Sequence, residues 1–93
     1  MNREEATSVL GKVMAVYRAK PYKALVRSVD QTVHIDMQGP SGTKYQIDVQ
    51  VMWDGPANGD LRVLGAVDDG SWRAIAPIGD SFILRPDGTF VGE

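Results

Sequence analysis

Apolar and polar side chains recur with the period of an α-helix over the first twenty residues of the chain. The apolar positions follow the i, i+3, i+4, i+7 spacing of one helix face, and they are Ala6, Val9, Leu10, Val13, Met14 and Tyr17. Asn2 is a suitable N-cap, and Glu5 three residues later completes a capping box. Pro21 ends the pattern, because the residue before a proline is pushed out of the helical region. The sequence therefore predicts an amphipathic helix over about residues 3–20, in which Gly11 lets another element approach closely.

Beyond this helix the apolar period changes from 3.6 to 2, which is typical of strands with one buried face. The clearest alternation lies in YQIDVQVMWD, residues 45–54, where the odd-numbered positions are apolar. The stretch GPSGT at 39–43 has turn composition, so we expect the strands on either side of it to form a hairpin. Altogether the pattern predicts strands at about residues 22–30, 31–38, 44–53, 60–67, 71–78 and 81–85, with a short one at 89–91.

Two adjacent carboxylates in AVDDGSW, residues 66–72, raise the question of a metal or proton-transfer site. Asp69-Gly70 is a strong signal for a two-residue hairpin loop, because both central positions of a type I′ turn require positive φ. That loop would align apolar or small residues across two strands: Val67 with Trp72, Gly65 with Ala74, Val63 with Ala76 and Leu61 with Ile78. The turn explains the surrounding pattern and an acid pair explains none of it, so we interpret Asp68 and Asp69 as turn residues.

The last turn and the order of the elements define the expected fold. Pro86-Asp87-Gly88 fits a type I turn followed by a left-handed glycine. A helix followed by about five to six strands, joined mostly by hairpins, predicts a single α+β domain over residues 1–93, with the N-terminal helix on one face of an antiparallel meander sheet. This element order resembles the cystatin-like arrangement, which implies a helix held against a long meander and no particular function.

Composition and charge narrow the function classes. The chain has 93 residues, 43% of them hydrophobic, and no cysteine, so disulfides, thiolate zinc sites and cysteine nucleophiles are excluded. Without a signal-like segment or a membrane-length apolar run, we expect a cytoplasmic protein with no membrane partner. Six basic and three acidic residues give residues 1–30 a charge of +3, whereas four basic and nine acidic residues give the remainder −5. The overall balance of −2 disfavours nucleic acid as a partner.

Two small groups of polar residues are weak candidates for chemistry. His34 shares a sheet face with Asp36, and the 39–43 turn brings either Asp48 or Gln46 opposite it, so that a carboxylate beside the imidazole could support general-base catalysis. The alternative is a solvated strand pair without a catalytic role, which we favour. One histidine among scattered aspartates has no metal-ligand spacing, so neither a metal nor a cofactor is expected.

The second group interleaves basic residues with tyrosines between residues 17 and 27, and its candidates for anion or nucleic-acid contact are Arg18, Lys20, Lys23 and Arg27. The same cations at a helix end also offset the helix dipole, and Tyr17 lies on the apolar stripe. We therefore favour the structural interpretation of these residues.

The outer sheet face carries apolar residues that a solvated face should not have. In the predicted register Leu64 opposes Ile75, and Ala66 and Met52 extend the same patch. Either the C-terminal hairpin folds across this patch, or a partner covers it, most often a second copy of the chain. The candidate interface residues are therefore Met52, Leu64, Ala66 and Ile75.

Three functions follow from these features. The first, which we favour, is a non-enzymatic binding module, homodimeric through a sheet face. The second is a small enzyme or ligand-binding protein of cystatin-like or NTF2-like architecture that uses His34 with Asp36 or Asp48. The third is weak binding to anionic surfaces through the basic residues.

Overall fold

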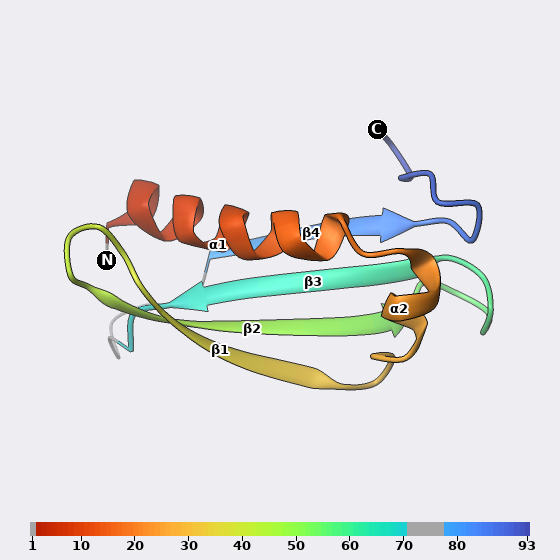
Figure 1. The fold of residues 1–93 in the computed structure, drawn as a ribbon, viewed down its shortest axis with the longest axis horizontal. Coiled ribbons are helices and arrows are strands. Elements are labelled where there is room, and N and C mark those ends of the chain that lie inside the picture. Colours follow the sequence, from red (N-terminus) through yellow and green to blue (C-terminus); the bar gives the residue numbers. More distant parts are fainter. Residues whose placement is uncertain (1, 71–77) are drawn as a thin grey trace.

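The computed structural model describes residues 2–70 and 78–93. Figure 1 shows a long helix lying against one face of a sheet, with a short second helix at one end. The elements, in chain order, are α1 (Arg3–Arg18), α2 (Tyr22–Val26), β1 (Thr32–Gln38), β2 (Lys44–Trp53), β3 (Leu61–Asp68) and β4 (Ile78–Leu84). The described residues thus form an α+β fold with four strands, not the five to six expected from the sequence.

The sheet is an antiparallel meander in which each strand pairs with the next one along the chain, in the order β1-β2-β3-β4. α1 packs over β2, β3 and β4, whereas β1 lies beyond the helix at the border of the sheet (Figure 1). Short connections favour this order, because consecutive antiparallel strands can be joined by tight turns.

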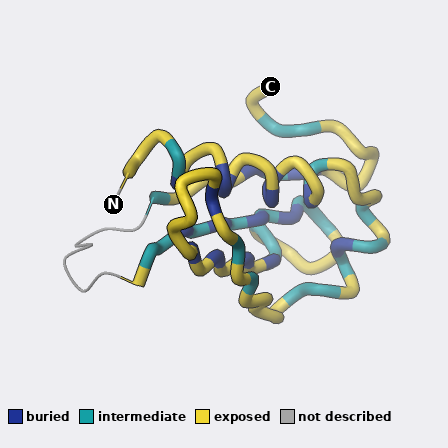
Figure 2. Tube along the Cα trace, turned by 60° about the vertical axis from the view of Figure 1, so that its left-hand side comes forward, coloured by how far each residue is buried: buried dark blue, intermediate teal, exposed yellow. Residues whose placement is uncertain are grey.

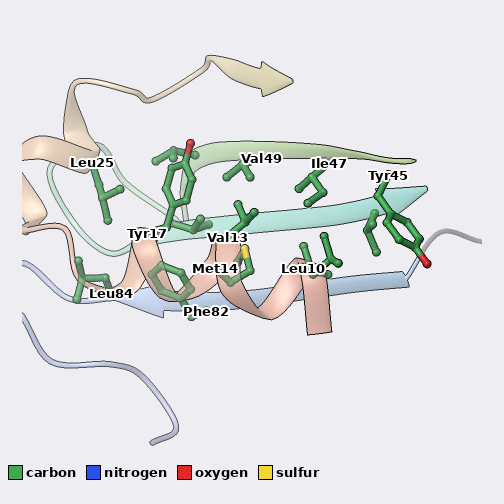
Figure 3. Close-up of a cluster of buried hydrophobic side chains, with 14 of the residues drawn as sticks. Leu10, Val13, Met14, Tyr17, Leu25, Tyr45, Ile47, Val49, Phe82 and Leu84 are labelled. Carbon is green, nitrogen blue, oxygen red and sulfur yellow. The ribbon is translucent and has the colours of Figure 1, made fainter. Parts of the chain in front are cut away.

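The predicted helix stripe and the predicted alternation in β2 together make the core. Every residue of the α1 stripe is buried, and β2 alternates strictly between exposed and buried positions from Lys44 to Val51. Figure 3 shows the facing side chains of α1 and the sheet meeting in one layer, and Figure 2 shows buried positions recurring along α1 and along the inner strands. The largest fully buried side chains include Tyr45, Leu10, Met14, Leu25 and Ile47. Local periodicity was thus sufficient to find this core.

The start of α1 follows the predicted cap only in part. The Asn2 side chain accepts a hydrogen bond from the Glu5 backbone N–H at 3.0 Å, as an N-cap should. The Glu5 carboxylate, however, accepts hydrogen bonds from Ser41 and Tyr45. The capping residue was therefore predicted correctly, and the tertiary contact of Glu5 was not.

The strand predicted at residues 22–30 is wrong, because α2 occupies its first half. Pro21 precedes the helix with φ −69° and ψ 155°, and its carbonyl accepts hydrogen bonds from Ala24 and Leu25. Leu25 is fully buried in the core, and the Tyr22 hydroxyl donates to the Gly59 carbonyl at 2.7 Å. The i, i+3, i+4 spacing of Tyr22, Leu25 and Val26 is helical, a signal masked by the branched residues around it.

The register predicted for the strand after residue 60 is also wrong. β3 pairs with residues 78–84, so that Leu61 faces Leu84, Val63 faces Phe82 and Val67 faces Ile78. Most of the predicted partner strand, residues 71–77, lies outside the described residues, and Ile78 opens β4 instead of facing Leu61. Both ladders match apolar residues across the pair, so local pattern does not distinguish them. The observed ladder buries Phe82 and Leu84 under α1.

The predicted turns agree with the structure in most details. The hairpin at 39–43 closes through a hydrogen bond from Gly39 N–H to the Thr43 carbonyl at 2.8 Å. In the last turn Gly88 has φ +89° and donates to the Arg85 carbonyl, as expected for a glycine after Pro86-Asp87. The strand predicted at 89–91 is reduced to one bridge between Leu84 and Phe90.

Gly70 has the expected positive φ, +81°, and its N–H donates to the Asp68 side chain. Positive φ at non-glycine positions of the described chain occurs at Asp30 and Asn58, so Asp69 lacks the φ that a type I′ turn requires. Gly70 therefore has the expected left-handed φ and bonds the Asp68 side chain, but the two-residue hairpin loop predicted at Asp69-Gly70 is wrong, because β3 pairs with residues 78–84.

The glycine that allows α1 to approach the sheet is Gly65, not Gly11. A Cβ on Gly65 would lie 2.5 Å from Sδ of Met14, whereas a Cβ on Gly11 would meet nothing within 4 Å. Gly11 faces solvent on α1, so the close approach expected there is wrong.

Because Gly11 has free space around it, replacement by alanine should stabilise the protein. We expect Gly11→Ala to raise the free energy of unfolding by about 0.5–1 kcal/mol, since glycine loses more backbone entropy in a helix. Urea unfolding followed by circular dichroism measures the change. A loss of stability would mean that Gly11 is covered in solution.

Candidate functional site

The sheet face opposite α1, here called the open face, gathers most of the residues singled out from the sequence. Antiparallel pairing places directly opposed residues on the same face. β1 and β2 contribute Thr32, His34, Asp36, Gln38, Lys44, Gln46, Asp48, Gln50 and Met52, and β3 and β4 contribute Arg62, Leu64, Ala66, Asp68, Gly79, Ser81 and Ile83. Its β1 and β2 half is mainly polar, and its β3 and β4 half contains half-buried apolar side chains.

The apolar part of the open face centres on Leu64. Arg62 is paired with Met52 on one side and with Ile83 on the other, so both of these residues are diagonal neighbours of Leu64. Diagonal pairs in a sheet are about 7–8 Å apart, close enough for long side chains to touch. Met52, Leu64, Ile83 and the neighbouring Ala66 are each half-buried. We call these four residues the apolar patch.

The apolar patch retains three predicted interface residues and replaces the fourth. Ile75 lies outside the described residues, and Ser81 now opposes Leu64. Ile83 was missed because the predicted register was wrong, although it shares a face with Ser81 by simple alternation. The C-terminal segment packs elsewhere: Phe90 meets Phe82 edge-on at 5.6 Å, on the α1 side of β4.

Charged groups surround the apolar patch. Asp54 holds Arg62 through Oδ1, which lies 3.0 Å from Nε and 2.8 Å from an Nη atom. Asp36 and Asp48 lie on β1 and β2, and Asp68 lies at the end of β3. Arg62 is already paired, and Lys44 is the other basic residue of the described strands on this face, so the apolar centre has a mainly acidic surround.

The structure brings His34 together with Asp48, its partner in the β1–β2 register, and leaves Asp36 opposite Gln46. Nδ1 of His34 lies 2.5 Å from Oδ1 of Asp48, and the two side chains are 76% and 55% exposed. They line a shallow hollow of about 250 Å³ on the sheet surface. Solvent reaches both groups, so their mutual field is strongly screened. The pair therefore lacks the enclosure that positions a substrate and excludes water.

A larger hollow of about 490 Å³ lies at the end of the β1–β2 hairpin and is lined by Asp36, Met37, Gln38, Lys44, Tyr45, Gln46 and Asp69. Its polar lining residues are mostly exposed, and the described residues contain no group of three or more side chains that could hold a metal ion. Nothing in this hollow converges on one reacting atom.

Two of the four basic residues considered for anion binding contact aromatic rings of the chain itself. The Arg18 guanidinium lies 4.9 Å from the centre of the Phe82 ring and donates to both Glu93 carboxylate oxygens, at 2.7 and 2.9 Å. The hydrogen bond to Glu93 raises the pKa of Arg18. Nζ of Lys20 lies 5.3 Å from the Tyr17 ring centre. Lys23, in α2, and Arg27, its C-cap, are exposed.

Glu5 ties the start of α1 to the β1–β2 turn, a contact that no local sequence pattern predicted. Its carboxylate accepts hydrogen bonds from the Ser41 hydroxyl at 2.6 Å, the Ser41 N–H at 2.9 Å and the Tyr45 hydroxyl at 2.7 Å. These bonds, led by the Ser41 hydroxyl, lower the pKa of Glu5 below its ordinary value of 4.5. The same carboxylate raises the pKa of Tyr45 to about 12.

These shifts predict how stability depends on pH. Glu5 has a lowered pKa in the folded state, so its contribution is complete above about pH 4.5 and disappears as the pH falls through the folded pKa. Tyr45 has a raised folded pKa, so its contribution is complete below about pH 10 and disappears as the pH rises through about 12. We expect Glu5→Gln to reduce the urea midpoint at pH 7, and this reduction to shrink as the pH falls below about 4.5.

Glu4→Gln is the matched control, because Glu4 lies in the same helix turn without the bonds to Ser41 and Tyr45. If Glu5→Gln and Glu4→Gln changed the pH profile equally, the helix dipole rather than the turn contact would explain the effect.

Comparisons of the chain with profiles of known protein families, with curated proteins and with solved structures found no match. The function proposed below is therefore inferred from the geometry of this chain. Within the described residues, no helix is long and apolar enough to cross a membrane.

Proposed function

We propose that this domain is a non-enzymatic interaction module that binds a protein partner through its open face. The observation that carries the proposal is the apolar patch of Met52, Leu64, Ala66 and Ile83, half-buried on a sheet face that α1 does not cover. Apolar centres with polar rims are typical of protein interfaces. The charge around the patch indicates the partner: its surface should have an apolar centre flanked by lysine or arginine, to complement Asp36, Asp48 and Asp68.

An alternative function, a ligand-binding protein or enzyme of cystatin-like or NTF2-like architecture, would use His34 with Asp48. The contact between Nδ1 and Oδ1 supports it, since an oriented imidazole can act as a general base. The exposure of both side chains speaks against it, and we therefore favour the interaction module.

Native mass spectrometry of the protein purified from its own cells distinguishes the two functions. An interaction module should carry a second protein chain, and hydrogen exchange of that complex should show protection over residues 44–53 and 61–68. A bound small molecule that is lost in a His34→Ala variant would support the alternative instead.

Leu64→Asp is the decisive variant for the open face. Because Leu64 lies at the centre of the apolar patch, we expect the partner's dissociation constant to rise at least tenfold, as for a central interface residue. Lys12→Asp is the matched control, since Lys12 is exposed on α1, on the far side of the sheet. Equal binding by Leu64→Asp and the unmodified chain would exclude the patch as the recognition surface.

A further inference from the structure

Among the described strands β1 pairs only with β2, so it forms an open edge of the sheet. Figure 1 shows no described element beyond it. At the opposite edge, the C-terminal segment partly covers β4, through the bridge between Leu84 and Phe90 and the hydrogen bond from Val91 N–H to the Ile83 carbonyl. Edge strands in stable monomers are usually protected by proline, lysine or a bulge. β1, TVHIDMQ, contains neither proline nor lysine.

The hydrogen-bond pattern shows which backbone groups of β1 are unpaired. Gly39 donates to Thr43, so this pair at the end of the hairpin is hydrogen-bonded. Directly opposed residues of an antiparallel pair alternate between bonded and non-bonded. Counted back from Gly39, this alternation directs the backbone N–H and C=O groups of the odd-numbered residues of β1 toward β2. The backbone N–H and C=O groups directed away from β2 belong to Thr32, His34, Asp36 and Gln38.

The side of β1 that faces α1 is apolar and incompletely covered. Val33, Ile35 and Met37 alternate along this side, but α1 lies over β2, β3 and β4. Val33 is 38% exposed, and Ile35 and Met37 are half-buried at the margin of the core. An added strand would extend the sheet and cover this apolar side.

We infer that β1 pairs antiparallel with β1 of a second copy of the chain, about a two-fold axis at Ile35, to form a continuous eight-stranded sheet. Only this axis pairs all seven residues of the strand. It also joins outward-directed backbone groups to one another, because Thr32 then faces Gln38 of the second copy and His34 faces Asp36. On the other side Ile35 faces its own counterpart and Val33 faces Met37.

Charge selects the same register. The axis at Ile35 brings each His34 beside Asp36 of the second copy, two opposite-polarity pairs that add to the contact of His34 with Asp48. An axis at Asp36 would instead set two carboxylates directly opposite each other, which is destabilising. An axis at His34 would set two imidazoles opposite each other and shorten the paired stretch to five residues. Self-complementarity therefore identifies the occupant of this edge as a second copy of the chain.

A single strand pair is a small interface, so we expect a weak dimer with a dissociation constant on the order of micromolar. The two-fold axis runs through the sheet, so both α1 helices lie on one side and both open faces on the other. The dimer thus presents two copies of the apolar patch on the same side of the sheet, separated by the two β1 strands, and it adds self-association to the proposed function without depending on it.

Cysteine cross-linking tests the register directly, because the chain has no cysteine of its own. In Ile35→Cys the two sulfur-bearing residues face each other with Cα atoms about 4.5–5.5 Å apart, within the range of a disulfide. In Val33→Cys the two copies of residue 33 are four strand positions out of register, about 13 Å apart, and should not react. The double variant Val33→Cys, Met37→Cys should cross-link again. Mild oxidation, non-reducing electrophoresis and mass spectrometry give the yields, with circular dichroism to confirm folding.

The non-covalent dimer is measured by sedimentation equilibrium of the cysteine-free chain over a micromolar range. We expect Asp36→Lys to raise its dissociation constant at least tenfold, and Ser8→Lys, an exposed change on α1 away from β1, to leave it unchanged. Leu64→Asp should cross-link as well as its parent when combined with Ile35→Cys, which separates this edge from the partner-binding patch.

Two results would overturn the inference. One is an Ile35→Cys protein that folds but gives no more disulfide dimer than Val33→Cys. The other is an unmodified chain that stays monomeric at all concentrations measured. An intact Ile35→Cys cross-link in the Leu64→Asp background supports the dimer, whether or not Leu64→Asp also loses partner binding.

Discussion

Replacing Phe82 by alanine is expected to lower the free energy of unfolding by about 3–5 kcal/mol. Phe82 is only 4% exposed, and it meets Phe90 edge-on with the Arg18 guanidinium above its ring. The substitution removes a buried aromatic ring and also the support for the C-terminal segment. For a domain of this size the loss is a large share of total stability. Chemical denaturation followed by tryptophan fluorescence gives the value.

Phe82→Leu and Phe90→Ala separate the two parts of this effect. Leucine keeps most of the buried volume, so Phe82→Leu should cost much less than the alanine variant. Phe90 is half-buried, so its removal should cost less than that of Phe82 while releasing the same segment. If Phe82→Ala cost under about 1 kcal/mol, β4 would not be packed under α1 as the structure places it.

Gly65→Ala should cost about 1–3 kcal/mol, although it adds a single methyl group. Its Cβ would lie 2.5 Å from Sδ of Met14 and 3.0 Å from Cδ1 of Leu10, and both of these residues are almost fully buried. α1 would have to move away from β3 or repack its inner side chains. Thermal and urea unfolding should both show the loss.

Two comparisons make this result specific. Gly11→Ala adds the same methyl group to α1 in open space and should change stability in the opposite direction. Shortening the neighbour tests the contact: Met14→Ala combined with Gly65→Ala should cost less than the sum of the two single changes. Strict additivity would show that Met14 and Gly65 do not meet.

The candidate site shows which residue positions can be predicted from sequence patterns alone. Alternation and the 39–43 turn were enough to place His34 on the open face and to limit the residue opposite it to Asp48 or Gln46. The register then selects Asp48, because Gln38 pairs with Lys44 at the end of the hairpin. The apolar patch was located through Met52, Leu64 and Ala66, but its fourth member, Ile83, required the observed pairing of β3 with β4.

Other residues owe their positions to contacts between distant segments. Glu5 was placed correctly in the first turn of α1, yet its carboxylate binds Ser41 and Tyr45, more than thirty residues away along the chain. Gly65 is an ordinary strand glycine by sequence, and only the helix above it makes it necessary. The apolar side of β1 is only partly covered because α1 does not extend over it, which the strand's own alternation does not reveal.

By itself, the sequence determined α1, the β1–β2 hairpin and the faces of β2 and β3. These features depend on periodicity, capping and turn chemistry, which involve residues close to one another in the sequence. Only the tertiary structure decided that residues 22–26 are helical, that β3 pairs with residues 78–84, and that β1 remains an edge. In each case the competing local patterns are nearly equivalent, and the choice depends on which apolar side chains, such as Leu25, Phe82 and Leu84, reach the core under α1 and α2.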